Sequence, residues 1–189
     1  MLARLASTLV TRDPSIVGHA TRVTMLATQL AQWLEWDDSR MRVLSIGVPL
    51  HDIGKVAVSE AILRKPGPLD PRELAEIRRH PLTGASLLDP AGFAGPAIPY
   101  VLFHHERWDG GGYPLGRAGD TIPEEARLLA VVDAFDAMTF GRPFRRPLTV
   151  DAALAELDRC SGTQFEPAVV RAFVDAYDAG DVDLRRRAS

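Results

Sequence analysis

PSIVGHATRVTMLATQLAQWLEW, residues 14–36, shows the pattern on which the fold class depends. Apolar residues recur in it at spacings of three and four, as they do along one face of an α-helix. They are Val23, Leu26, Leu30 and Leu34. Asp13 and Pro14 suit the N-cap and the first turn of such a helix. The stretch therefore predicts an amphipathic helix with one buried face.

Helical patterns continue along most of the chain. We expect further helices over 39–54, from 70–71 onward, and over 81–88, 96–107, 123–139, 150–160 and 166–178. Pro49 should kink the first of these, and Asp70, Pro71 and Glu73 form a capping-box start for the second. The stretches 65–70 and 109–123 are predicted loops. No alternating run indicates a strand, so we expect a single-domain, all-α bundle over residues 1–189.

Composition limits the function classes. A length of 189 residues suits one domain with a sizeable core, and 46% hydrophobic residues are ordinary for a globular protein. The net charge of −3 argues against a protein that coats a nucleic acid polymer. A single cysteine, Cys160, excludes an internal disulfide and fits a reducing compartment. The short apolar start is broken by Arg4, so it predicts neither a membrane segment nor a secretory signal. We expect a cytoplasmic protein.

The five histidines are the candidates for metal chemistry. His51 precedes Asp52 in LHDIGK, and Asp133 lies in the apolar run AVVDAFDAM, where an unpaired buried carboxylate would be costly. Imidazole and carboxylate together suit iron, manganese or zinc. Asp136 reads as part of a solvated helix face. Spacing alone leaves a metal site and a set of ordinary surface histidines equally open.

The order of the motifs is more specific than any one of them. The chain reads GHATR, HDIGK, KPG, HP, HHERWDGGGYP, VVDAFDAMT and GRPFR. This series resembles the HD-GYP family, a branch of the HD-domain metal-dependent phosphohydrolases, from about residue 13 to residue 170. The resemblance implies a helical bundle with a dinuclear metal site in its core. It also implies hydrolysis of cyclic di-GMP, a bacterial second messenger, to pGpG or GMP.

The resemblance assigns roles to individual residues. One metal would be held by His19, His51, Asp52 and Asp133. The second would be held by His80, His104 and His105, with Asp52 shared between the two. Two divalent transition metals are implied, iron or manganese before zinc. They would lower the pKa of a bridging water to about 7, and the resulting hydroxide would attack the phosphodiester.

Substrate-binding positions are implied as well. Asp52 and Lys55 would be catalytic, with Lys55 beside the scissile phosphate. Gly112 and Tyr113 would form a wall next to the substrate, and Arg142 and Arg145 would lie near its phosphates. The family often has a glutamate where this chain has Ser15, and serine is a poor metal ligand, so the sequence favours two metals over three.

Two alternatives stay open. One is an HD-type phosphohydrolase that acts on another nucleotide, against which the GYP loop, the double histidine and GRPFR argue. The other is a module that binds cyclic di-GMP, or a signalling partner of a protein such as a diguanylate cyclase, without useful catalysis. The intact ligand set argues against the second, because a receptor needs no metal-activated water.

Overall fold

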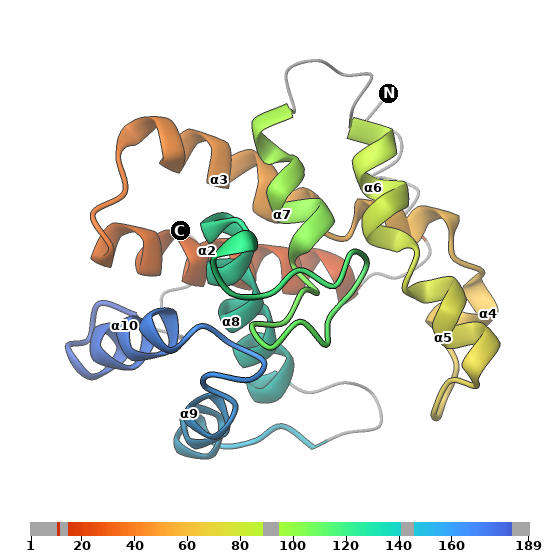
Figure 1. Cartoon of the computed structure of the whole chain (residues 1–189). Helices are drawn as coiled ribbons and strands as arrows, with labels where there is room; N and C mark the ends of the chain where they lie inside the picture. Colours follow the sequence, from red (N-terminus) through yellow and green to blue (C-terminus); the bar gives the residue numbers. More distant parts are fainter. Residues whose placement is uncertain (1–10, 12–14, 89–94, 141–145, 183–189) are drawn as a thin grey trace.

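The structure is a computed structural model that describes residue 11 and residues 15–88, 95–140 and 146–182 (Figure 1). Its α-helices are α2 (Ser15–Trp33), α3 (Asp38–Leu50), α4 (Glu60–Leu63), α5 (Pro71–Ile77), α6 (His80–Leu88), α7 (Ile98–Phe103), α8 (Glu124–Thr139), α9 (Val150–Arg159) and α10 (Pro167–Asp178). Short 3-10 turns are η1 (Ile53–Ala57), η3 (Gly95–Ala97) and η4 (Gly119–Thr121). Over these residues there is no strand, only an isolated bridge between Ser161 and Phe165. The all-α prediction is confirmed.

The core lies where α2 and α8 meet. In Figure 1, α2 and α3 run side by side, α8 packs against α2, and α9 and α10 lie against α8. Leu26 and Leu30 of α2 are fully buried, as the sequence pattern predicted, and they share one apolar cluster with Phe135 of α8 and Phe173 of α10. The two phenyl rings meet edge to face, with 4.8 Å between their centres. The cluster thus packs both α2 and α10 against α8.

Two predicted helices are shorter than the sequence indicated. The helix expected over 39–54 ends at Leu50, one residue after Pro49, and η1 follows it. Proline removes a backbone donor and crowds the preceding turn, which favours an end here over a kink. The helix expected over 96–107 is α7 alone, preceded by η3 and ending before the double histidine. Because both helices end early, the proposed ligands that follow them lie in turns, where the chain changes direction.

The start of α5 follows its sequence signal. Asp70 accepts hydrogen bonds from the backbone N–H groups of Arg72 and Glu73, and the Glu73 carboxylate accepts one from the Asp70 N–H. This reciprocal pair is the predicted capping box. The corresponding Asp13–Pro14 start lies outside the described residues.

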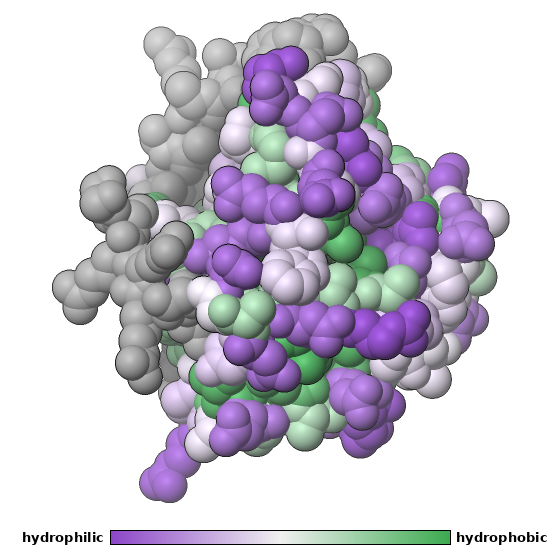
Figure 2. All heavy atoms as spheres, turned by 90° about the vertical axis from the view of Figure 1, so that its left-hand side faces the viewer, coloured by the Kyte–Doolittle hydropathy of each residue, from purple (hydrophilic) through white to green (hydrophobic). Residues whose placement is uncertain are grey.

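Polar side chains are spread over the surface. Figure 2 shows one face on which charged and polar residues surround a smaller gathering of apolar ones. This agrees with amphipathic helices such as α9, whose Ala153 and Leu157 are buried while Asp151 is exposed. None of the described helices has both the length and the apolar character that crossing a membrane requires.

Candidate metal centre

Five elements bring the proposed ligands together. His19 lies on α2 and Asp133 on α8, which pack against each other. The other five follow or begin a helix: His51 and Asp52 form the turn after α3, His80 begins α6, and His104 and His105 follow α7. All seven predicted ligands lie in one region of the bundle.

Gly54 explains how Asp52 reaches His80. A Cβ atom added at Gly54 would clash with the backbone carbonyl of His80 and with the backbone of Gly84. The absence of a side chain therefore lets η1 lie directly against the start of α6. The glycine of HDIGK is thus required by a close backbone approach. This approach brings the Asp52 carboxylate next to His80.

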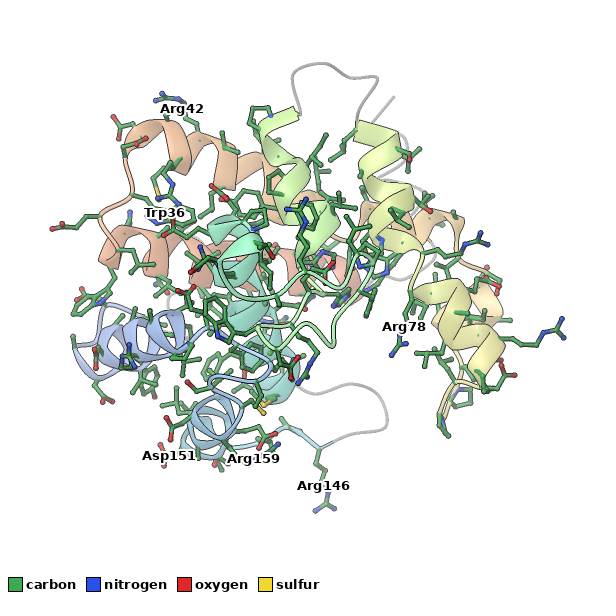
Figure 3. All side chains as sticks on the ribbon, viewed as in Figure 1. Trp36, Arg42, Arg78, Arg146, Asp151 and Arg159 are labelled. Atoms are coloured by element: carbon green, nitrogen blue, oxygen red, sulfur yellow. The ribbon has the colours of Figure 1, made fainter. Side chains whose placement is uncertain are left out.

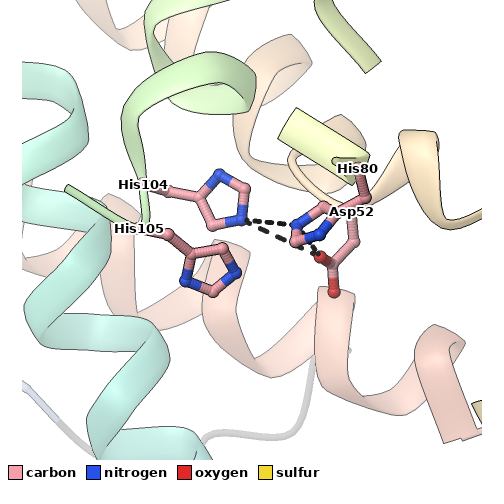
Figure 4. A group of neighbouring side chains, drawn as sticks. All are labelled: Asp52, His80, His104 and His105. Atoms are coloured by element: carbon pink, nitrogen blue, oxygen red, sulfur yellow. Dashed lines mark hydrogen bonds and ion pairs between the residues drawn. The ribbon is translucent and has the colours of Figure 1, made fainter. Parts of the chain in front are cut away.

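The ligand atoms form two groups that share one carboxylate. Asp52, His80, His104 and His105 offer atoms within 4.8 Å of one another, as do His19, His51 and Asp52. Figure 4 shows the first group, in which the three imidazoles converge with the Asp52 carboxylate.

The two oxygens of Asp52 face different histidines. Its Oδ1 lies 3.3 Å from His80 Nε2 and 3.8 Å from His104 Nε2. Its Oδ2 lies 3.4 Å from His51 Nε2 and 2.5 Å from Lys55 Nζ. A carboxylate placed in this way can bridge two cations, one on each oxygen.

Three imidazoles are oriented by the backbone. The Nδ1–H groups of His51, His80 and His104 each donate to the carbonyl three residues earlier, at 2.7, 2.7 and 3.0 Å. A carbonyl can only accept, so the proton is on Nδ1 and the Nε2 lone pair faces the cluster. Hydrogen bonds of this kind set the tautomer and ring orientation of metal-binding histidines.

His19 is oriented by a carboxylate that the sequence did not identify. Its Nδ1 lies 2.8 Å from Asp136 Oδ2, and its Nε2 lies 3.2 Å from Asp133 Oδ1. Asp136 is buried and also pairs with the Arg22 guanidinium at 2.6 Å, so the expectation of a solvated helix face is wrong. The available signal was spacing, since Asp136 follows Asp133 by one turn as Arg22 follows His19.

Charge differs between the two groups. Burial lowers the pKa of His19, but its hydrogen bonds with Asp133 and Asp136 outweigh this and raise the pKa to about 9. Burial and the neighbouring His80 lower the pKa of His105 to about 3. Burial and His105 likewise lower the pKa of His104 well below its usual value. His104 and His105 are therefore neutral at pH 7, whereas His19 carries a proton.

The acidic residues stay ionised. Burial opposes the charge of Asp52, but Lys55 and His51 hold the pKa of this carboxyl well below its usual range. Burial also opposes the charge of Asp133, and the hydrogen bond from His19 lowers its pKa nonetheless. Each group of imidazoles thus has an anionic oxygen beside it.

These residues fit a divalent metal. His51 Nε2 and Asp52 Oδ1 are buried and have no hydrogen-bond partner among the described residues. His80 Nε2 and His104 Nε2 lie 3.3 Å apart, where two lone pairs repel unless a proton or cation lies between them. Neutral imidazoles with carboxylates are the donor set that iron, manganese and zinc prefer. The buried cluster is therefore compatible with divalent metal binding.

The glycine-rich loop is anchored over the double histidine. Tyr113 donates its backbone N–H to the His105 carbonyl at 3.1 Å, and its ring stacks on the His105 imidazole with 4.8 Å between centres. Gly112 approaches so closely that an added Cβ would clash with the backbone of Glu106 and Arg107. Both predicted loop residues thus lie next to the cluster.

Glu106 is a structural residue that the sequence did not reveal. Its buried carboxylate accepts hydrogen bonds from the backbone N–H groups of Leu115 and Arg117, at 2.7 and 3.0 Å. One side chain therefore holds the far part of the loop against the turn that contains His105. A glutamate directly after the double histidine was the only available signal.

Of the remaining predicted residues, Lys55 and Ser15 lie in the part of the chain that the structure describes. Lys55 lies in η1 and not on a helix with His51 and Asp52, and its ammonium pairs with the Asp52 carboxylate. Ser15 begins α2. Arg142 and Arg145 lie outside the described residues.

The chain matches the HD domain family over residues 4–169. It therefore belongs to the HD-domain family. Its GYP loop and its curated relatives place it in the HD-GYP branch, as the sequence predicted.

Three curated relatives illustrate the match. It is 39% identical to the cyclic di-GMP phosphodiesterase response regulator RpfG of Xanthomonas campestris, over 92% of this chain and 46% of that protein. It is 41% identical to a cyclic di-GMP phosphodiesterase of Pseudomonas aeruginosa, over 89% of this chain and 41% of that protein. A 3'3'-cGAMP-specific phosphodiesterase of Vibrio cholerae is 33% identical over 94% of this chain and 34% of its own length. The chain spans less than half the length of these relatives.

Solved structures share the fold. An HDG"Y"P protein of Bdellovibrio bacteriovorus aligns with a TM-score of 0.69 at 23% identity, covering 86% of this chain and 52% of that one. The HD domain of the Listeria monocytogenes phosphodiesterase PgpH, in complex with cyclic di-AMP, aligns with a TM-score of 0.63 at 18% identity, covering 93% and 95%. These likenesses establish the HD-type helical bundle.

Proposed function

We propose that this chain is a metal-dependent phosphodiesterase that hydrolyses cyclic di-GMP to pGpG, to GMP, or to both. The observation that carries the proposal is the position of Asp52, whose two oxygens face two different groups of histidines. Two adjacent cations are the usual means of stabilising both the attacking and the leaving oxygen of a phosphodiester. The names of the relatives in Xanthomonas and Pseudomonas support cyclic di-GMP as the substrate.

The proposed cofactor is a pair of divalent transition metals, iron or manganese before zinc. His19, His51, Asp52 and Asp133 would hold one, and His80, His104, His105 and Asp52 the other. When bound, the pair binds phosphate oxygens and lowers the pKa of a water molecule. The mixture of imidazole and carboxylate ligands, without a thiolate, supports this choice of metals.

The chain's own groups would act on the substrate in complementary ways. Asp52 would hold both metals, since its two oxygens face different histidines. Lys55 has three N–H donors and uses one on Asp52, so the others are free for a phosphate oxygen. Gly112 and Tyr113 would border the substrate, and Arg142 and Arg145 would bind its phosphates.

The cellular setting follows from the substrate. Cyclic di-GMP is made and degraded inside bacterial cells, so we place the protein in the cytoplasm, with signalling proteins such as a diguanylate cyclase as partners. One relative is a response regulator, which supports a role in signalling.

The test is a hydrolysis assay on anaerobically purified protein whose metal content is measured in the same sample. Turnover of cyclic di-GMP that requires about two metals per chain is the expected result. A panel of nucleoside triphosphates and alarmones separates the proposal from a general HD phosphohydrolase. Tight binding without product in fully loaded protein would indicate a binding module.

A second substrate has a specific reason to be in the panel. Relatives named 3'3'-cGAMP-specific phosphodiesterases are 33–34% identical to this chain, and those named cyclic di-GMP phosphodiesterases are 34–41% identical, so the two ranges meet. Comparing kcat/KM for 3'3'-cGAMP and cyclic di-GMP decides between them. We expect the larger value for cyclic di-GMP.

A further inference from the structure

Arg78 is an exposed cation beside the cluster. It follows α5 and comes two residues before His80. It has no carboxylate partner among the described residues. Ion pairs do involve Arg22, Arg40, Arg64, Arg107, Arg127 and Arg159. In Figure 3, Arg78 projects from the end of α5 on the side that faces the rest of the bundle.

The guanidinium of Arg78 is held by an aromatic ring. Its central carbon lies 5.2 Å from the centre of the Tyr113 ring, which in turn stacks on His105 with 4.8 Å between centres. Arg78 is therefore no farther from the His105 imidazole than these two distances added together. A cation over a ring is attracted through its flat face, so the N–H groups on the edge stay available to an anion.

We propose that Arg78 is a substrate-binding residue that takes the second phosphodiester of the cyclic dinucleotide, the one that is not cleaved. This inference rests on the function proposed above. A cyclic dinucleotide has two phosphodiesters on opposite sides of one macrocycle, and only one of them can lie on the metals. The other needs a cation nearby, and arginine suits it because two parallel N–H groups match two phosphate oxygens. Lys55 pairs with Asp52 on the metal side, so its remaining donors would serve the scissile phosphate. Arg78 would act on the second phosphodiester together with Arg142 and Arg145, which lie outside the described residues.

The experiment compares steady-state kinetics of the metal-loaded enzyme and of four variants. Arg78→Ala should raise KM for cyclic di-GMP about tenfold, as the loss of one charge-assisted contact predicts. The value of kcat and the metal content should stay as in the wild type. Arg78→Lys should retain most of the affinity, whereas the uncharged Arg78→Gln should lose it as alanine does. Arg79→Ala is the matched control, because Arg79 is the next residue and is also exposed.

A substrate with a single phosphate makes the test specific. Bis(p-nitrophenyl) phosphate has only the scissile group, so Arg78→Ala should leave its KM and kcat unchanged. An equal loss on both substrates would overturn the inference, because Arg78 would then act on the scissile phosphate or through His105. Wild-type affinity in Arg78→Gln would overturn it too, since the charge would not be used.

Failure of the proposed function would look different. In that case the wild type itself would not turn over cyclic di-GMP, whereas failure of the Arg78 inference leaves an active wild type and an Arg78→Ala variant like Arg79→Ala. Calorimetric binding of cyclic di-GMP to the same proteins provides a readout without turnover. A dissociation constant that rises about tenfold in Arg78→Ala alone supports the inference, and equal constants, or no binding by the wild type, reject it.

Discussion

Asp136 on α8 accepts a hydrogen bond of 2.8 Å from Nδ1 of His19 on α2. The same carboxylate pairs with Arg22, whose guanidinium lies 3.9 Å from the centre of the Phe140 ring. A buried charge thus sets the orientation of a proposed ligand without itself belonging to the cluster. A carboxylate that orients a metal-binding histidine in this way usually contributes strongly to the affinity for the metal.

Asp136→Asn should therefore weaken metal binding at the His19 side by about 10- to 100-fold. The amide keeps the shape of the carboxylate but lacks the charge that orients the imidazole. Metal titrations followed by calorimetry measure the effect, and Asp158→Asn, an exposed position on α9, is the control. Thermal unfolding should be recorded as well, because Arg22 loses its charged partner. An unchanged affinity in a folded variant would contradict the orienting role.

Asp52→Ala should abolish hydrolysis and lower the content of both metals, because the carboxylate faces both groups of histidines. Elemental analysis after reconstitution, together with the activity of the same sample, checks this. The loss of one metal alone would mean that Asp52 is not shared. Full activity would remove the dinuclear hypothesis altogether. Asp158→Ala is the matched control on an exposed surface.

Metal binding should depend on pH more steeply in the His19 group than in the group that contains His104 and His105. The pKa of His19 is about 9, so at pH 7 this imidazole must release a proton before it can bind a metal. Affinity at the His19 side should therefore rise about tenfold per pH unit from pH 6 and level off above pH 9. The pKa of His51 is also raised, since the charge of Asp52 outweighs the opposing effect of burial, and this steepens the rise.

The second group provides an internal reference. The pKa of His105 is about 3 and that of His104 is well below its usual value, so neither has a proton to release between pH 6 and pH 9. One metal should thus dissociate before the other as the pH falls. Titrations at several pH values would show a steeper change of affinity with pH at the His19 side than at the other. His19→Ala should remove most of the slope, and two parallel curves would contradict the assignment.

Lys55→Ala should lower kcat, because the activation free energy should rise by about 2.7–4 kcal/mol, as it does when one preorganised donor is lost. Its metal content should be retained, since an ammonium does not bind metals. Lys65→Ala is a natural control, because Lys65 is the other lysine of the chain and pairs with Glu73 on α5. Arg142→Ala and Arg145→Ala should mainly raise KM, the mark of lost uniform binding. Wild-type turnover in Lys55→Ala would reject its role at the phosphate.

Gly54→Ala should destabilise the fold by about 1–3 kcal/mol and reduce metal content, because the new methyl group would push η1 away from α6. Thermal unfolding and elemental analysis measure the two effects. Gly95→Ala, where an added Cβ meets no atom within 4 Å, is the control and should have neither effect. Equal behaviour of the two variants would show that the close approach at Gly54 is not needed.

The sequence pattern was sufficient to predict the all-α class and structural features that depend on residues close together in the chain. The buried face of α2 and the capping box at Asp70 depend on residues a few positions apart, so their signals are visible in a short window. Helix ends were harder to predict. Pro49 gave a local signal near the end of α3, but the end of α7 depends on where the chain must turn to bring His104 next to His51, and that requirement comes from distant parts of the chain.

The identities of the proposed ligands were also available from the sequence, because each one occurs in a short motif. Most of their relationships were not. The family resemblance implied that Asp52 is shared by two groups, but that Asp136 is buried and paired and that Arg78 lies over Tyr113 depend on contacts between different elements. A residue's burial and its partners are set by the packing of whole elements, so a charged residue on a helix reads as solvated until its neighbour is placed. The sequence by itself determined which side chains could bind metal and phosphate, and the tertiary structure decided which of them meet.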